Sequence, residues 1–150
     1  MMPIKALLMR SAAGASPALD KAAIATAFPS STFSTSSATY TNLLNGSGGS
    51  AISVTLQKGT GTQIWIGGAA HLTVGTSTQV VLGVNDGTTD YDLGQRAIDG
   101  IYRTVAGDIL ISGLAAGTYT FTLRIKVPGV TSVDFDNACS AFIRAMEVAA

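Results

Sequence analysis

Ten residues near the C-terminal end of the chain alternate strictly between polar and apolar side chains. The run Thr118–Val127 reads TYTFTLRIKV, so a large apolar residue stands at every second position from Tyr119 onward. Because successive side chains of a β-strand point to opposite faces of a sheet, the run predicts a strand with one buried and one polar face. A shift of its register by one residue would turn every large apolar side chain toward water. The chain therefore contains a sheet that covers a hydrophobic core.

Similar apolar runs recur from residue 38 onward, and glycine-rich turns such as NGSGG (45–49) and KGTG (58–61) separate them. Strands at this spacing favour an all-β sandwich or barrel of about eight strands over an α/β fold. An Asp- and Gly-rich loop is predicted at 85–94. The predicted strands are Ala38–Leu44, Ala51–Gln57, Thr62–Leu72, Thr78–Asp86, Ala97–Val105, Asp108–Ser112, Thr118–Val127 and Ala138–Val148.

Two of these strands are apolar on both faces. In Thr62–Leu72 the side chains of Ile64 and Ile66 oppose that of Trp65, and the last strand is mixed in the same way around Ile143. An antiparallel sheet usually keeps one face polar toward water. Strands with two apolar faces therefore predict that the outer face of the sheet is covered as well, by neighbouring subunits.

Residues 1–37 differ from the rest of the chain and are predicted to form an N-terminal arm outside the β-domain 38–150. Ala, Ser and Thr dominate this segment. A helix is predicted over 16–28, with Ser16 as N-cap, Pro17 at its first position and Pro29 as its stop. Residues 30–37 are predicted to be extended. The arm is either a mobile tail or a segment that docks on a neighbouring chain.

Charged residues are scarce, at 12% of 150 residues against about 25% in an average soluble domain. Nine basic and nine acidic residues leave a net charge of zero, which argues against a nucleic-acid-binding protein. Such a surface favours association, so we predict an oligomer or a component of an assembly. A single cysteine excludes an internal disulfide, and the longest uncharged stretch is too polar to span a membrane.

Few residues could carry catalysis, since the chain has one His, one Cys and one Glu. His71 and Cys139 are therefore predicted to be structural, and no enzymatic activity and no cofactor are expected. The loop with Asp86, Asp90 and Asp92 is the best candidate for a Ca²⁺ site. Its spacing does not match an EF-hand, so these residues are predicted to form a solvated turn without metal.

The passage GLAAGTYTFTLR (113–124) resembles a passage in tailed-bacteriophage virion proteins that carry a tumour necrosis factor-like jelly roll. The early segment ATYTNL (38–43) and the final strand SAFIRAMEV (140–148) fit the same family pattern, whereas KVPGV (126–130) departs from it. The resemblance implies an antiparallel jelly-roll sandwich of about eight strands, preceded here by an extended or helical arm. It also implies a homotrimer, and small members of this kind act as capsid decoration (cement) proteins.

From the resemblance we expect a virion protein on the outer capsid surface that stabilises the shell by binding the major capsid protein. The apolar residues expected to anchor the arm to the capsid or to a neighbouring subunit are Ile4, Leu7, Leu8, Leu19, Ile24, Phe28 and Phe33. The candidates for the trimer interface are Trp65, Ile143, Arg124 and Arg144. An arginine in such a seam needs a partner, for which Asp99, Asp108 or Glu147 could serve.

Two other functions remain open at this point. A receptor- or glycan-binding domain of a fibre, neck or tail structure would need exposed aromatic side chains, for which Tyr91 and Tyr102 are the candidates. A small hydrolase is disfavoured by the single His and the single Glu.

Overall fold

The alternating run forms the longest strand of one sheet. In the computed structural model it is β9 (Gly117–Lys126), and Phe121, Leu123 and Ile125 are buried, with at most 1% of their surface exposed. Tyr119 is half-buried against the core, and the threonines between these residues face outward. This prediction is confirmed.

The structure describes residues 21–74, 78–98, 102–129 and 131–150, and all regular elements in them are β-strands. These described residues contain no helix that could cross a membrane. The strands are β1 (Ala22–Ala27), β2 (Phe33–Thr35), β3 (Thr41–Asn42), β4 (Ser53–Lys58), β5 (Thr62–Val74), β6 (Thr78–Asn85), β7 (Asp90–Ile98), β8 (Arg103–Ile111), β9 (Gly117–Lys126), β10 (Val133–Phe135) and β11 (Ala141–Ala149).

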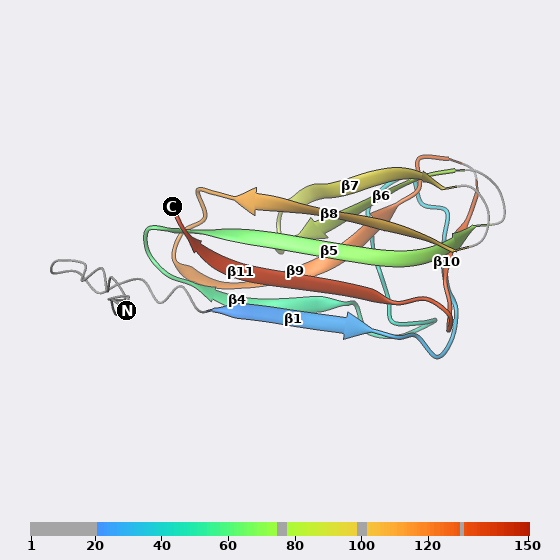
Figure 1. Cartoon of the computed structure of the whole chain (residues 1–150), viewed down its shortest axis with the longest axis horizontal. Coiled ribbons are helices and arrows are strands. Elements are labelled where there is room, and N and C mark those ends of the chain that lie inside the picture. Colours follow the sequence, from blue (N-terminus) through green and yellow to red (C-terminus); the bar gives the residue numbers. More distant parts are fainter. Residues whose placement is uncertain (1–20, 75–77, 99–101, 130) are drawn as a thin grey trace, which may run out of the picture.

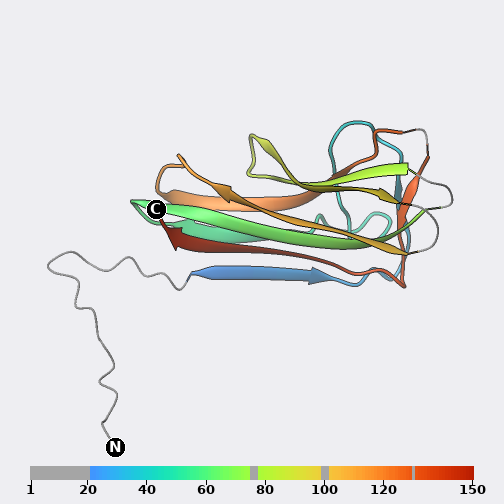
Figure 2. The same cartoon turned by 45° about the horizontal axis from the view of Figure 1, so that its top comes forward.

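The eight longer strands pair in a nested order. β1 pairs with β11, β4 with β9, β5 with β8 and β6 with β7, all antiparallel. This is a single long hairpin rolled up, so that the chain passes between two packed sheets at most of its turns. One sheet has the order β1-β11-β5-β8 and the other β4-β9-β6-β7; Figures 1 and 2 show their strands following the long axis of the molecule. The fold is an antiparallel jelly-roll sandwich, as predicted.

The core lies between the inner faces of the two sheets. Ile64 and Ile66 from β5, Ile143 from β11 and Phe121 from β9 are fully buried there, together with Phe135 from the short strand β10. Every second side chain of the long strands points into this layer. The register of the strand pairs is fixed by this burial, because a shift of one residue would turn the buried side chains of a strand toward water.

At one edge the two sheets approach each other through two glycines. A Cβ added at Gly107 on β8 would lie 1.9 Å from the carbonyl oxygen of Leu93 on β7, and one added at Gly94 would lie 2.4 Å from that of Ala106. No side chain fits between backbones at this distance, so glycine is required where β7 and β8 meet.

The prediction of a helix over 16–28 is wrong for the part that the structure describes. Residues 22–27 form β1, which pairs with β11 over its whole length, and β2 pairs with β10. Alanine is the strongest helix former, but helix propensity is a weak preference that pairing with another strand overrides. Ala23, Ala25 and Ala27 instead turn toward the core as Ile24 and Thr26 face outward. Residues 22–27 and 33–35 therefore belong to the sheets, and not to a separate arm. Residues 1–20 lie outside the described residues.

Two strand boundaries in the middle of the chain were also predicted wrongly. The segment predicted as a loop at 85–94 contains the first half of β7 (Asp90–Ile98), and the strand predicted at 97–105 spans the connection between β7 and β8. Acidic and threonine residues dominate this part of the sequence, which is typical of turns. Pairing of β7 with β6 over its whole length overrides that local preference.

Candidate interaction face

The two sheets of the sandwich present very different outer faces. On β9 the outward positions carry Thr118, Thr120, Thr122, Arg124 and Lys126, so that face is polar. The outward positions of β1, β11, β5 and β8 are largely apolar. We call this second surface the apolar face; its larger residues are Ile24, Trp65, Leu110, Phe142, Arg144, Met146, Val148 and Asp108.

One cross-strand row of the apolar face is entirely apolar. Ala22, Met146, Trp65 and Leu110 lie side by side on β1, β11, β5 and β8. The exposed fractions are 52% for Leu110 and 39% for Met146, and that of Ile24 in the next row is 68%. Large apolar side chains that stay this exposed at neighbouring positions form a patch, and such patches mark interaction surfaces.

The next row carries the charges of this face. It runs Ile24, Arg144, Gly67 and Asp108 across the same four strands. Arg144 and Asp108 both contact Trp65: the guanidinium carbon lies 4.4 Å from the centroid of the indole ring, and the indole Nε1 donates a hydrogen bond of 3.0 Å to Asp108 Oδ2. The tryptophan thus holds one cation and one anion in fixed positions.

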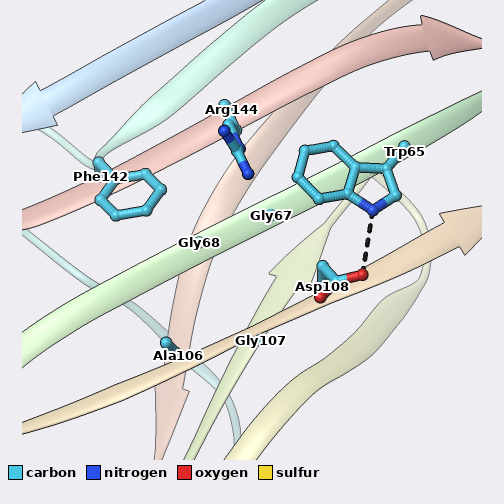
Figure 3. Close-up of a pocket in the computed structure, with 8 residues that line it drawn as sticks. All are labelled: Trp65, Gly67, Gly68, Ala106, Gly107, Asp108, Phe142 and Arg144. Carbon is cyan, nitrogen blue, oxygen red and sulfur yellow. Dashed lines mark hydrogen bonds between the residues drawn. The ribbon is translucent and has the colours of Figure 1, made fainter.

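A hollow of about 280 Å³ opens beside this tryptophan. The backbone of Gly67, Gly68 and Gly107 forms its floor, and the hollow stays open because Gly67 has no side chain to project toward Trp65 and Arg144. Figure 3 shows Trp65, Asp108, Arg144 and Phe142 arranged around these glycines on the same side of the sheet. A second hollow, of about 320 Å³, lies between Trp65, Leu110 and Met146.

The four residues predicted for a trimer interface do not lie together. Trp65 and Arg144 are neighbours on the apolar face. The prediction of Ile143 as an interface residue is wrong, because its side chain is fully buried in the core of the single chain and offers no surface to a partner. It follows from the strict alternation of β11 that residues beside Arg144 point inward. Arg124 lies on β9 in the other sheet.

Arg124 belongs to a charged network on the polar face. Its guanidinium makes an ion pair of 2.9 Å with Asp90 and donates a hydrogen bond of 2.6 Å to the carbonyl oxygen of Tyr40. Lys126 and the hydroxyl of Tyr40 both contact Asp92. The bond from Tyr40, followed by that from Lys126, holds the pKa of the Asp92 carboxyl below its usual value. Both cations of this network, Arg124 and Lys126, therefore have a carboxylate partner within the chain.

Of the two described carboxylates among those considered as partners for a seam arginine, one remains available. Glu147 is buried and accepts hydrogen bonds from Gly59 and Thr62. Asp99 lies outside the described residues. Asp108 is exposed and lies in the same row as Arg144.

The residues predicted to anchor the arm have mixed positions. Ile24 is on the apolar face, and Phe28, directly after β1, is 73% exposed. Phe33 is half-buried and packs against the core. Residues Ile4, Leu7, Leu8 and Leu19 lie outside the described residues.

The groups considered for chemistry have structural partners. His71 Nδ1 lies 3.0 Å from Thr104 Oγ1, and its ring stacks on that of Tyr102, with 5.7 Å between the centroids. Burial raises the pKa of the Cys139 thiol to about 11.

The two tyrosines considered for glycan binding differ in their surroundings. Tyr91 donates a hydrogen bond to Asp86, whereas Tyr102 is exposed.

Asp86 organises the acidic loop as a turn. Its Oδ1 accepts hydrogen bonds from the backbone nitrogens of Thr88 and Thr89, at 2.9 and 2.7 Å. Within the described part of the chain, no three His, Cys, Asp or Glu side chains are grouped so that they could hold a metal ion.

The sequence pattern does not single out Leu110 or Met146, the two exposed apolar side chains on either side of Trp65 in its row. The exposure of Met146 can be predicted from the sequence, because Met146 stands at one of the alternate positions of the last strand that point outward. Leu110 lies in the strand predicted at Asp108–Ser112, but the three consecutive apolar residues 109–111 do not indicate which face it takes.

No protein-family model and no curated protein matches this chain. Solved structures with a similar course of the chain include the vertex protein P5 of PRD1, with a TM-score of 0.49, 12% identity and coverage of 87% of this chain and 98% of that one. Another is Eiger TNF from S. frugiperda, with a TM-score of 0.48, 13% identity and coverage of 86% and 93%. A third is murine APRIL, with a TM-score of 0.47, 13% identity and coverage of 84% and 99%.

Proposed function

We propose that this chain is a structural protein of a virion that assembles as a homotrimer through the apolar face and decorates the outer surface of a capsid. The observation that carries the proposal is the contrast between the two outer faces of one small sandwich. The trimeric state and the capsid as partner come from the resemblance of GLAAGTYTFTLR (113–124) to phage virion proteins.

The apolar face can supply the free energy for association. Burying a Leu, Ile or Met side chain fully contributes about 1.5–3 kcal/mol relative to leaving it in water. Leu110, Met146, Ile24 and Trp65 lie in two adjacent rows and would be buried together. Association costs about 4–15 kcal/mol in lost freedom, so a cluster of this size is needed, and the polar face has none.

The scarcity of charge points the same way. With a net charge of zero, copies of the chain do not repel one another at long range. The polar face, with its satisfied ion pairs, would remain in contact with water in the assembly.

The role is mechanical and needs no catalytic group. A trimer bound to a shell places three equivalent contacts at once, so that weak individual contacts add up through effective concentration. The apolar residues Ile4, Leu7, Leu8 and Leu19 in segment 1–20 are the proposed capsid contacts, and they would link neighbouring capsid subunits.

Self-association is tested with two matched aspartates. In Leu110→Asp a charge enters the apolar face, whereas in Gln57→Asp the same charge enters an exposed position on β4 in the other sheet. Sedimentation of the full chain should give a trimer for the parent and for Gln57→Asp, and monomer for Leu110→Asp at the same concentration. A parent protein that stays monomeric at high concentration would remove the proposal.

Capsid binding is tested by a deletion. Removing residues 1–20 keeps every described strand in the chain. The truncated chain should therefore still form a trimer but should no longer sediment with capsids that lack their own decoration protein. Unchanged binding would place the capsid contact elsewhere.

The alternative function, a receptor- or glycan-binding domain, is favoured only by the exposed ring of Tyr102 stacked on His71. A glycan array with the parent chain and with Tyr102→Ala tests it.

A further inference from the structure

The apolar face carries one cation and one anion that have no charged partner among the residues that the structure describes. Arg144 and Asp108 are the charged residues at the outward positions of β1, β11, β5 and β8 among the described residues. Both contact Trp65, but no ion pair joins either of them to another described residue.

These two charges lie on either side of Gly67 and do not pair with each other, because both contact Trp65 instead. Arg144 and Asp108 face Gly67 from opposite sides, on β11 and β8. Since neighbouring strands lie about 4.7–4.9 Å apart, their Cα atoms are separated by about 10 Å. Arg144 lies over the indole ring instead of reaching across the glycine floor toward Asp108.

A partner that covers this face must satisfy both charges. Large apolar side chains surround the row, so packing would remove Arg144 and Asp108 from water. A desolvated charge without a partner costs several kcal/mol. An acidic partner would leave Asp108 unpaired, and a basic partner would leave Arg144 unpaired.

We infer that the occupant of this face is a second copy of the chain, and that Arg144 of each copy pairs with Asp108 of its neighbour. This inference rests on the proposed self-assembly and adds the residues that set its register. A surface with one positive and one negative charge complements itself under rotation. In a two-fold interface both pairs form between the same two copies; in a ring of three, each copy gives its arginine to one neighbour and its aspartate to the other.

Trp65 prepares the pair before assembly. Its ring holds the guanidinium, and its Nε1 holds one carboxylate oxygen. The other oxygen of Asp108 and the N–H groups of Arg144 stay available for the neighbour. Less side-chain freedom is then lost on binding, which favours association.

A charge-swap series tests the pair in the full-length protein. Arg144→Glu leaves two anions on the face, and Asp108→Arg leaves two cations, so each single variant should associate about tenfold or more weakly than the parent. The double variant Arg144→Glu/Asp108→Arg restores opposite charges and should recover most of the affinity. Arg144→Gln, which removes the charge without reversal, should fall between the parent and Arg144→Glu.

Two readouts follow the series. Sedimentation equilibrium gives the association constant, and thermal unfolding confirms that each variant folds. Trp65 is the only tryptophan of the chain, so the fluorescence of the protein reports burial of this face directly. In the parent and in the double variant, the emission maximum should shift to shorter wavelength as the protein concentration rises.

The outcomes distinguish a failure of the inferred Arg144–Asp108 pairing from a failure of the proposed self-assembly. If the parent associates and the double variant is as weak as the two singles, or if the singles associate like the parent, the pairing is wrong while the proposed assembly stands. If the parent does not associate at any concentration, both fall.

Discussion

The carboxylate of Glu147 on the last strand lies 2.5 Å from the backbone nitrogen of Gly59, in the turn between β4 and β5. The same oxygen accepts a hydrogen bond of 2.7 Å from Thr62 Oγ1. This buried anion connects the C-terminal strand to a turn that lies far away in the sequence. The hydrogen bonds from Thr62 and Gly59 outweigh burial and hold the pKa of Glu147 below its usual value.

Glu147 should therefore make the stability depend on pH in the acidic range. The folded pKa is lower than the unfolded pKa of about 4.3, so the contribution is fully present above the unfolded pKa and is lost as the pH falls through the folded pKa. At pH 7, Glu147→Gln should lower the free energy of unfolding by about 1–3 kcal/mol, because the hydrogen bonds lose their charge.

Urea unfolding of the parent and of Glu147→Gln, at one protein concentration, checks this. The gap between the two proteins should narrow as the pH is lowered from 7 to about 3. A gap of constant size would mean that the ionised form of Glu147 is not the one that stabilises the fold.

Gly107 on β8 should not tolerate even one methyl group. Its Cβ would lie 1.9 Å from the carbonyl oxygen of Leu93, so Gly107→Ala forces β7 and β8 apart. Overpacking of this kind costs about 1–3 kcal/mol, and more where backbone must move. Gly117→Ala is the matched control, because its Cβ would meet only Tyr119, at 3.8 Å. Thermal unfolding should show a clear loss for Gly107→Ala alone; equal melting temperatures would contradict the close approach.

The symmetry of the assembly can be read from a mixture of the two single charge variants. Arg144→Glu chains carry two anions on the apolar face, and Asp108→Arg chains carry two cations, so every contact between unlike chains is attractive. Two unlike chains can satisfy both contacts of a dimer. A ring of three chains drawn from two kinds always contains at least one contact between like chains.

An equimolar mixture should therefore recover only part of the parent's association constant if the protein is a trimer, as proposed. Sedimentation equilibrium of the mixture, compared with each variant alone, measures this. Full recovery in a species of two chains would instead indicate a dimer.

Cys139 should resist modification in the folded protein. The side chain is 3% exposed, and burial raises the pKa of its thiol to about 11. At pH 8 the reactive thiolate is thus both rare and covered. Ellman's reagent should react within the dead time in urea and far more slowly in buffer. As a control, Gln57→Cys in a Cys139→Ser background places an exposed thiol on β4, which should react at once without urea.

The sequence alone determined the architecture of the core. The period of two in Thr118–Val127 fixed which side chains of β9 are buried, because one residue of slip would expose all of them. The short apolar runs and glycine turns gave an all-β sandwich. Local patterns of this kind depend only on neighbouring residues, and they are confirmed by the structure.

Tertiary structure decided the elements whose local preference was weak or misleading. Ala22–Ala27 has the composition of a helix but pairs with β11, and Asp90–Ile98 begins like a turn but pairs with β6. In both segments a long partner strand supplies hydrogen bonds and burial that outweigh intrinsic propensity. No neighbouring residue signals such a partner.

The candidate site divides in the same way. The two-sided apolar character of the strand around Trp65 was visible in the sequence and predicted a covered outer face. That Arg144, Gly67 and Asp108 form one row could not be predicted, since they come from three strands whose register depends on the whole sandwich. Alternation along one strand is a local property of the chain, whereas adjacency across strands is a property of the fold.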